Sequence, residues 1–298
     1  MIFYLVDVFA EEPYSGNQLA VFLCNPLSEL MQKLAREMNL SETTFITSSE
    51  LENNGYNVRI FTLKRELPFA GHPTIGTAFI IRNEVIKDNI PSINLNLAIG
   101  QIPVTFHDDG TIWMKQNAPI FGHIHDKSEM AKVLRIDKSD IHDELPVRES
   151  STGNPHIIVP LNSLEAVKNV DVDVPRFKEL LDAADPELGA NGICVFTPET
   201  IYPNNDFNVR VFGHLRSVPE DPATGSAIGN LAGYLVHHGY FGDTYAAMKR
   251  VEQGYEIERP SLLLFSTGRK NNEIEVYVGG KVRMVAKGEL IIDSSNSE

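Results

Sequence analysis

Cysteine is scarce in this sequence. Only Cys24 and Cys194 occur among 298 residues, and each stands alone among apolar neighbours. A structural zinc site needs cysteines or histidines at short fixed spacings, and a dithiol redox site needs a Cys-x-x-Cys pair. Both classes are therefore excluded, and we expect the two cysteines to be ordinary core residues.

Positive charge is also in short supply. Lys and Arg number 26 against 40 Asp and Glu, which gives a formal net charge of −14. Such a surface repels phosphate backbones and anionic membranes, so neither nucleic acid nor a membrane is an expected partner. No apolar run reaches the roughly 18 residues of a membrane-spanning helix, and Asp7 comes too early for a signal peptide. The expectation is a cytoplasmic protein.

Sequence motifs for bound cofactors are missing as well. There is no G-x-x-x-x-G-K-[ST] phosphate loop, no strand-anchored G-x-G-x-x-G and no H-x-x-x-H pair within a helix. Ser226 stands in Thr-Gly-Ser-Ala-Ile rather than in the G-x-S-x-G turn of a serine hydrolase, so a triad of Ser226, His72 and Asp221 is disfavoured. We therefore predict that the protein uses no metal and no cofactor.

An internal repeat organises the chain. The segment Asn-Val-Arg-Ile-Phe at 57–61 recurs 151 positions later as Asn-Val-Arg-Val-Phe, and the same offset relates Leu67 to Val218 and Pro68 to Pro219. A weaker echo, at an offset of 137, pairs Ser-Gly-Asn ending at position 17 with Thr-Gly-Asn ending at position 154. The chain is long enough for two domains. The repeats therefore indicate a duplicated fold, with a small-molecule site expected between the halves.

Both copies of the repeat follow the same local plan. Each repeated pentapeptide alternates like a strand and leads through a glycine-containing loop into an apolar helix, at 74–81 and 227–236. These helices mix Gly and Ala with large aliphatic residues, so we expect each to be buried at the centre of its half. Pro73 suits the first position of one helix, and Ser226 suits the N-cap of the other.

The predicted fold is therefore α+β, with two pseudo-symmetric halves, each a mainly antiparallel sheet wrapped around a central helix. The first half is expected over 1–116, with a C-terminal strand within 283–298 returning to it, and the second half over 117–282. Gly279-Gly280 predicts a hairpin turn between two strands.

The two helix starts are the candidate binding elements. Gly71-His72 and Gly225-Ser226 occupy equivalent positions, and a helix N-terminus presents backbone N–H groups and a positive dipole end. A pair of such starts suits a substrate carboxylate and would stabilise an enolate-like charge. The alternative is a pair of well-capped helices without a ligand.

Three titratable residues lie near these helix starts. His72 and Asp221 each precede a proline, which disfavours helix at both positions. Glu42 follows an amphipathic helix expected at 28–38, where a polar turn changes into a strand. All three are candidates for acid/base chemistry. The alternatives are a loop histidine, a turn-forming aspartate and a surface glutamate.

Five segments taken together form a specific pattern: Asp-Val-Phe at 7–9 with Gly-Asn-Gln-Leu-Ala-Val at 16–21, Ser-Glu-Thr at 41–43, Leu-Pro-Phe-Ala-Gly-His-Pro-Thr at 67–74, Glu-Asp-Pro-Ala-Thr-Gly-Ser-Ala at 220–227, and Gln-Gly at 253–254 with Arg-Pro-Ser at 259–261. With this pattern the sequence resembles the PhzF-like isomerase family of phenazine biosynthesis, whose fold is that of diaminopimelate epimerase. The resemblance runs over nearly the whole chain.

The resemblance implies roles for the candidate residues. Glu42 would be the general acid/base that moves a carbon-bound proton, with His72 and Asp221 orienting polar groups of the substrate. The backbone amides around three residues would hold the substrate carboxylate: Gly71, Gly225 and Ser226. The chemistry would need no cofactor, because a single carboxylate can remove a proton and return it elsewhere.

The resemblance also separates this chain from the epimerases of the same fold. Those enzymes use two cysteines at the two helix starts, where this sequence has His72 and Ser226, so racemisation by two thiols is disfavoured. The segment around Asn154 is similar to the substrate-binding segment of the epimerase. Asn154, and Asn17 by the internal echo, are therefore expected to line the site.

The sequence thus predicts a cofactor-independent isomerase acting on a small carboxylate-bearing molecule, an amino- or hydroxy-substituted cyclic acid. Two alternatives remain open: an amino-acid racemase or epimerase with Glu42 as one base, and a non-catalytic binder of a small carboxylate. The family resemblance implies a homodimer. The physiological substrate and pathway lie beyond what the sequence predicts.

Overall fold

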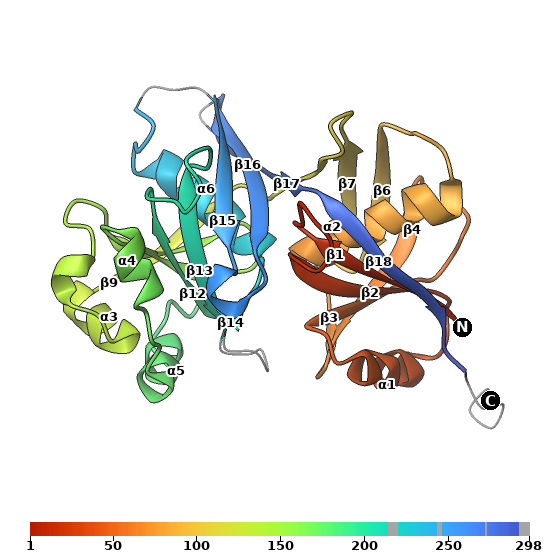
Figure 1. Ribbon diagram of the computed structural model, residues 1–298, viewed down its shortest axis with the longest axis horizontal. Helices are drawn as coiled ribbons and strands as arrows, with labels where there is room; N and C mark the ends of the chain where they lie inside the picture. Colours follow the sequence, from red (N-terminus) through yellow and green to blue (C-terminus); the bar gives the residue numbers. More distant parts are fainter. Residues whose placement is uncertain (214–219, 243–245, 272, 292–298) are drawn as a thin grey trace. The chain divides into compact units, whose positions relative to one another are not determined.

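The computed structural model describes residues 1–213, 220–242, 246–271 and 273–291, and the chain divides into two compact units (Figure 1). Unit 1 comprises Met1–Met114 with Gly280–Glu298, and unit 2 comprises Lys115–Gly279. Among the described residues, no helix combines the length and apolar character needed to cross a membrane.

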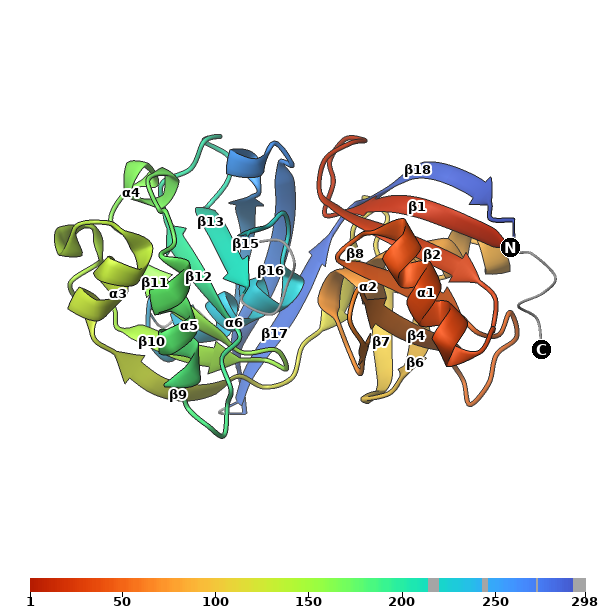
Figure 2. The same ribbon diagram turned by 90° about the horizontal axis from the view of Figure 1, so that it is seen from below.

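Unit 1 is a sheet with a helix packed on each face. Its strands run in the order β18–β1–β2–β3–β4–β6–β7–β8, with β2–β3 and β4–β6 parallel and the other pairs antiparallel. Figure 2 shows α1 on one face, where Phe22, Phe45 and Phe61 pack against Met31 and Leu34. The elements are β1 (Ile2–Val8), β2 (Asn17–Leu23), α1 (Ser28–Met38), β3 (Glu42–Ile46), β4 (Tyr56–Thr62), β5 (Glu66–Leu67), α2 (Gly71–Ile80), the π-helix η1 (Ile81–Ile86), β6 (Ser92–Leu97), β7 (Gly100–Phe106), β8 (Ile112–Lys115) and β18 (Val282–Glu289).

Helix α2 lies on the other face of the unit 1 sheet and is buried along nearly its whole length. The approach is close, since a Cβ at Gly76 would lie only 2.6 Å from Leu19 Cδ2 and 2.8 Å from Val8 Cγ2. The small residues that the sequence places in this helix are therefore what allows it to pack directly on β1 and β2.

Unit 2 repeats this design. Its strands run β9–β10–β11–β12–β13–β15–β16–β17, with β11–β12 and β13–β15 parallel. Helix α6 is its buried central helix, and α3, α4 and α5 contribute to an apolar cluster with β11 and β12. The elements are β9 (Ile120–His125), α3 (Lys127–Leu134), the short 3₁₀ helix η2 (Lys138–Asp140), β10 (Val147–Ser151), β11 (His156–Pro160), α4 (Leu164–Lys168), α5 (Val174–Asp182), β12 (Gly192–Thr197), β13 (Phe207–Gly213), β14 (Glu220–Asp221), α6 (Gly225–His237), β15 (Ala246–Gln253), the 3₁₀ helix η3 (Tyr255–Ile257), β16 (Ser261–Lys270) and β17 (Glu273–Gly280).

The strand registers confirm the duplicated, pseudo-symmetric fold. Ala20 pairs with Thr43 in the parallel β2–β3 ladder, and Ile157 pairs with Ile193 in the corresponding β11–β12 ladder. In unit 1, β18 pairs with the edge of β1 opposite β2, and in unit 2, β9 pairs with the edge of β10 opposite β11. The strand equivalent to β9, the first strand of unit 2, is therefore β18 in unit 1, which follows unit 2 in the sequence.

The register also corrects the alignment of the two copies. Phe61 pairs with Glu66, and its counterpart Phe212 pairs with Glu220, so the offset grows from 151 to 154 between the two strands. The counterpart of Leu67 is Asp221 rather than the predicted Val218. Val218 and Pro219 themselves lie outside the described residues.

Three local expectations are wrong. Gly279 and Gly280 are extended residues at the end of β17, which pairs with β16, while β18 pairs with β1, so they form no hairpin turn. Ser226 is the second residue of α6, and the N-cap is Thr224. Helix α2 begins at Gly71, which places Pro73 third in the helix, where a missing backbone N–H is still tolerated because it has no intrahelical partner.

The duplicated strands carry the same ion pair in two settings. Arg210 donates to Glu220 at 3.0 and 2.8 Å and also to the carbonyls of Val167 and Val170, with side chains of the ion pair only 10% and 8% exposed. Arg59 and Glu66 form the counterpart at 2.7 and 2.6 Å, with side chains 30% and 36% exposed.

We predict that Arg210→Ala lowers the free energy of unfolding by about 3–5 kcal/mol, because Glu220 is left charged and buried. The matched change Arg59→Ala should cost about 1 kcal/mol or less, because water can solvate Glu66. Urea unfolding followed by circular dichroism measures both. Equal losses in the two variants would contradict this account.

Candidate functional site

Glu42 is buried at the start of β3 in unit 1. Helix α1 ends at Met38, and the left-handed backbone of its C-cap Asn39 (φ 53°) turns the chain into this strand, where Glu42 pairs in register with Thr62. Only 2% of Glu42 is exposed. Glutamate side chains are seldom buried this completely. The alternative interpretation of Glu42 as a surface glutamate is therefore wrong.

His72 faces Glu42 from the first turn of α2. Its Nε2 lies 3.5 Å from Glu42 Oε2, and His72 is 4% exposed. The expectation that His72 precedes the helix is wrong: it is the second helical residue, directly after Gly71. Because α2 is buried, the side chain at this position is held inside unit 1 next to the carboxylate.

Asn17 begins β2 in unit 1 and is 1% exposed. Its position depends on Gly16, whose backbone is left-handed (φ 68°) and whose Cβ, if present, would lie 2.4 Å from the carbonyl oxygen of Val8. Only glycine fits there. The internal echo therefore has a backbone cause, since Gly153, before Asn154, also has a positive φ.

Unit 2 joins two of the predicted binding residues. Ser226 is the counterpart of His72, and the amide of Asn154 donates to Ser226 Oγ at 3.4 Å. Asn154 lies in the turn between β10 and β11, and its own Oδ1 accepts a hydrogen bond from Asn191. Gly225 is the first residue of α6. These polar groups gather around the N-terminus of one helix, where an anion is favoured.

Asp221 lies in β14 of unit 2 and is 2% exposed. Thr224 Oγ1 donates to its carboxylate, and Gln253 Nε2 donates to its backbone carbonyl at 2.7 Å. Gln253 Oε1 in turn accepts from the backbone N–H of Thr224 at 3.0 Å. Neither Thr224 nor Gln253 is among the site residues predicted from the sequence, although both belong to the family-like segments.

The two units differ at their equivalent positions. The β12–β13 register places Gly192 opposite Gly213, where the β3–β4 register places Glu42 opposite Thr62. Unit 1 therefore holds a carboxylate and an imidazole where unit 2 holds a glycine and the hydroxyl of Ser226. Symmetric two-base chemistry, as in a racemase with one base on each half, lacks its second base at this position.

Neither cysteine lies at a helix start. Cys194 is buried in β12, and Cys24, just after β2, is partly buried. Burial raises the pKa of the Cys24 thiol to about 11 and also raises the pKa of Cys194. Neither is a thiolate near neutral pH, which separates this chain from two-thiol epimerases.

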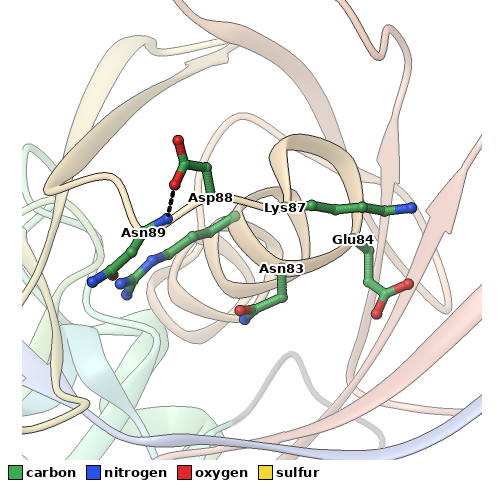
Figure 3. Close-up of a pocket in the computed structure, with 6 residues that line it drawn as sticks. Asn83, Glu84, Lys87, Asp88 and Asn89 are labelled. Atoms are coloured by element: carbon green, nitrogen blue, oxygen red, sulfur yellow. Dashed lines mark hydrogen bonds between the residues drawn. The ribbon is translucent and has the colours of Figure 1, made fainter.

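A polar pocket also lies on unit 1, beside η1 (Figure 3). Its lining includes Asn83, Glu84, Lys87, Asp88 and Asn89, with the N–H of Asn89 donating to Asp88 at 2.7 Å. It contains none of the predicted site residues. No group of three or more His, Cys, Asp or Glu that could hold a metal ion is found within the described part of the chain.

Comparison with known proteins places this arrangement in a family. The family model for phenazine biosynthesis-like proteins matches residues 6–288. The trans-2,3-dihydro-3-hydroxyanthranilate isomerase of Pseudomonas aeruginosa is 34% identical over 93% of this chain and 95% of its own, and an uncharacterized isomerase of Pasteurella multocida is 33% identical over 99% and 96%. The solved Bacillus anthracis protein of the PhzF family superposes with a TM-score of 0.88 at 24% identity, covering 98% of this chain and 99% of its own.

More distant structures share only the fold. A probable proline racemase from Agrobacterium radiobacter superposes with a TM-score of 0.63 at 9% identity, covering 99% of this chain and 95% of its own. The protein is thus an isomerase with a diaminopimelate-epimerase-like fold. The chain belongs to the phenazine biosynthesis-like protein family, the PhzF-like isomerases.

We predict that thiol alkylation spares the activity. With a pKa of about 11, about one Cys24 thiol in a thousand is ionised at pH 8, so iodoacetamide should react slowly and about tenfold faster per pH unit up to pH 11. Mass spectrometry follows the labelling, and isomerase activity is assayed in parallel, with Cys24→Ala as the control. Rapid inactivation at pH 8 that substrate prevents would contradict the prediction.

Proposed function

We propose that the protein is a cofactor-independent isomerase that moves a carbon-bound proton on a small cyclic acid bearing amino and hydroxy groups. The observation that carries this proposal is the buried pair of Glu42 and His72, with 3.5 Å between Oε2 and Nε2. A carboxylate that is shielded from water and faces an imidazole can accept a proton and give it back within the same site.

The proposed reaction needs only one acid/base group. Glu42 removes a proton from a ring carbon, and the electron pair left behind is delocalised into the conjugated system of the substrate. The carboxylic acid form of Glu42 then delivers the proton to another carbon of that system, so the atoms of substrate and product are the same. His72 keeps the Glu42 carboxyl group in one orientation while the proton is removed and then returned.

Unit 2 supplies the binding groups in this proposal. The carboxylate of the substrate would be held by the N-terminus of α6, with the amides around Gly225 and Ser226 and the side chain of Asn154 as donors. Asp221 is an acceptor for an amino or hydroxy group, and its carboxylate is already fixed by Thr224. The same positive helix end would stabilise negative charge that develops during proton removal.

The substrate class is suggested by the Pseudomonas aeruginosa relative, which acts on trans-2,3-dihydro-3-hydroxyanthranilate. That molecule has the carboxylate, amino and hydroxy groups that the residues of unit 2 can bind. It is therefore the first substrate to test, followed by related cyclic amino and hydroxy acids.

The deciding experiment follows carbon-bound deuterium by proton NMR. Wild-type protein incubated with trans-2,3-dihydro-3-hydroxyanthranilate in D₂O should form product that carries deuterium at carbon. We predict that Glu42→Gln slows the reaction on the order of 10²–10⁴-fold, because the amide cannot accept the proton. Circular dichroism of both proteins checks that they are folded.

Glu149→Gln is the matched control. Glu149 is a second fully buried carboxylate with an imidazole partner, His125 at 2.8 Å, but it lies in β10 of unit 2. The Glu149→Gln variant should incorporate deuterium into product at a rate within a few-fold of the wild type. Equal rates in wild type and Glu42→Gln would remove Glu42 from the mechanism. Ligand line broadening without any exchange, over the whole panel of acids, would instead indicate a binding protein.

A further inference from the structure

Asn230 is an unexpected residue in the middle of α6. It is fully buried in a helix that is otherwise apolar around it, between Gly229 and Leu231. Its counterpart in unit 1 is Gly76, where the packing against Leu19 and Val8 is entirely apolar. A buried amide is costly unless all its polar atoms are bonded, so its presence calls for partners.

The amide of Asn230 is bonded at both of its ends. Its Oδ1 accepts from the backbone N–H of Thr152 at 2.6 Å and from Thr152 Oγ1 at 3.0 Å. Its Nδ2 donates to the carbonyl of Asn154 at 2.8 Å and lies 2.9 Å from His156 Nδ1. Its backbone carbonyl accepts from Ser150 Oγ at 3.1 Å. One side chain thus holds the whole turn between β10 and β11.

This turn carries Asn154, and the start of the same helix carries Ser226. By fixing Thr152, Asn154 and His156 to α6, Asn230 sets the position of the Asn154 amide, which donates to Ser226 at 3.4 Å. An asparagine is suited to the task because it presents one acceptor and one donor in a single plane. Neither glycine, as in unit 1, nor an apolar residue could hold both the N–H and the carbonyl.

We infer that Asn230 is a positioning residue that sets substrate affinity by holding the 152–156 turn against α6. This inference rests on the proposed function, in which Asn154 and Ser226 contact the substrate carboxylate. All the contacts of Asn230 given above lie within unit 2, whereas Glu42 and His72 belong to unit 1. Loss of the amide should therefore weaken substrate binding more than it slows proton transfer.

Kinetics with trans-2,3-dihydro-3-hydroxyanthranilate tests this split. Asn230→Ala should raise KM at least tenfold while kcat changes less than threefold, because the acid/base pair is untouched. Asn230→Asp keeps the acceptor for Thr152 but loses the donor to Asn154, and its KM should fall between those of the wild type and the alanine variant. If the alanine variant does not fold, the aspartate variant decides the question, and an unchanged KM overturns the inference.

Tyr234→Phe is the matched control for a merely structural role. Tyr234 is buried one turn further along α6, and its hydroxyl donates to the carbonyl of Pro146 at 2.7 Å, just before β10. This variant loses a hydrogen bond between the same helix and the residue just before β10 but leaves the turn intact. It should keep the wild-type KM. A similar rise in KM for Tyr234→Phe and Asn230→Ala would overturn the inference.

Amide hydrogen exchange keeps this test separate from the proposed function. Peptides that cover 150–156 should lose protection in Asn230→Ala and Asn230→Asp but not in Tyr234→Phe. If wild-type protein does not turn over the substrate, the proposed function fails, and the exchange data still decide whether Asn230 holds the turn. Unchanged protection in both Asn230 variants would overturn the positioning role itself.

Discussion

The constraint on which the rest of this structure depends is the burial of a whole helix, including its polar start, inside each unit. Helix α2 has nine of its ten residues buried, and α6 is buried from Gly225 to Leu235. A side chain in the first turn of such a helix has little contact with water, so a polar one is stabilised by a polar partner. His72 finds the carboxylate of Glu42, and Ser226 finds the amide of Asn154. The chemistry of each unit follows from what sits at that helix start.

The two units share one duplicated fold but differ in the buried side chains at equivalent positions. The positions of Leu19 and Gly76 in unit 1 correspond to those of His156 and Asn230 in unit 2, so an apolar contact in one is a hydrogen-bonded pair in the other. At the starts of β3 and β12 the polar residue is instead in unit 1, which has Glu42 where unit 2 has Gly192. At these two pairs of equivalent positions, the carboxylate is found only in unit 1 and the amide only in unit 2.

Much of this could be predicted from local sequence because it depends on local physics. The repeated pentapeptides gave two equivalent strands, and the Gly- and Ala-rich apolar segments gave the two central helices. What could not be predicted depends on partners that are distant in the sequence. Gly279-Gly280 looks like a turn until β18 is seen to pair with β1, at the other end of the chain. The role of Asn230 depends on its hydrogen bonds to Thr152 and Asn154, which lie in the turn between β10 and β11, far from Asn230 in the sequence. The burial of Glu42 beside His72 likewise required the packing of α2 on the sheet.

The return of β18 to unit 1 separates the order of synthesis from the order of completion. Unit 2 is continuous in sequence over Lys115–Gly279, whereas the sheet of unit 1 includes a strand that begins at Val282. During translation, the second unit has all its strands while the first still lacks one. The segments that carry Glu42 and His72 are made before unit 2, yet the sheet around them is completed only after unit 2.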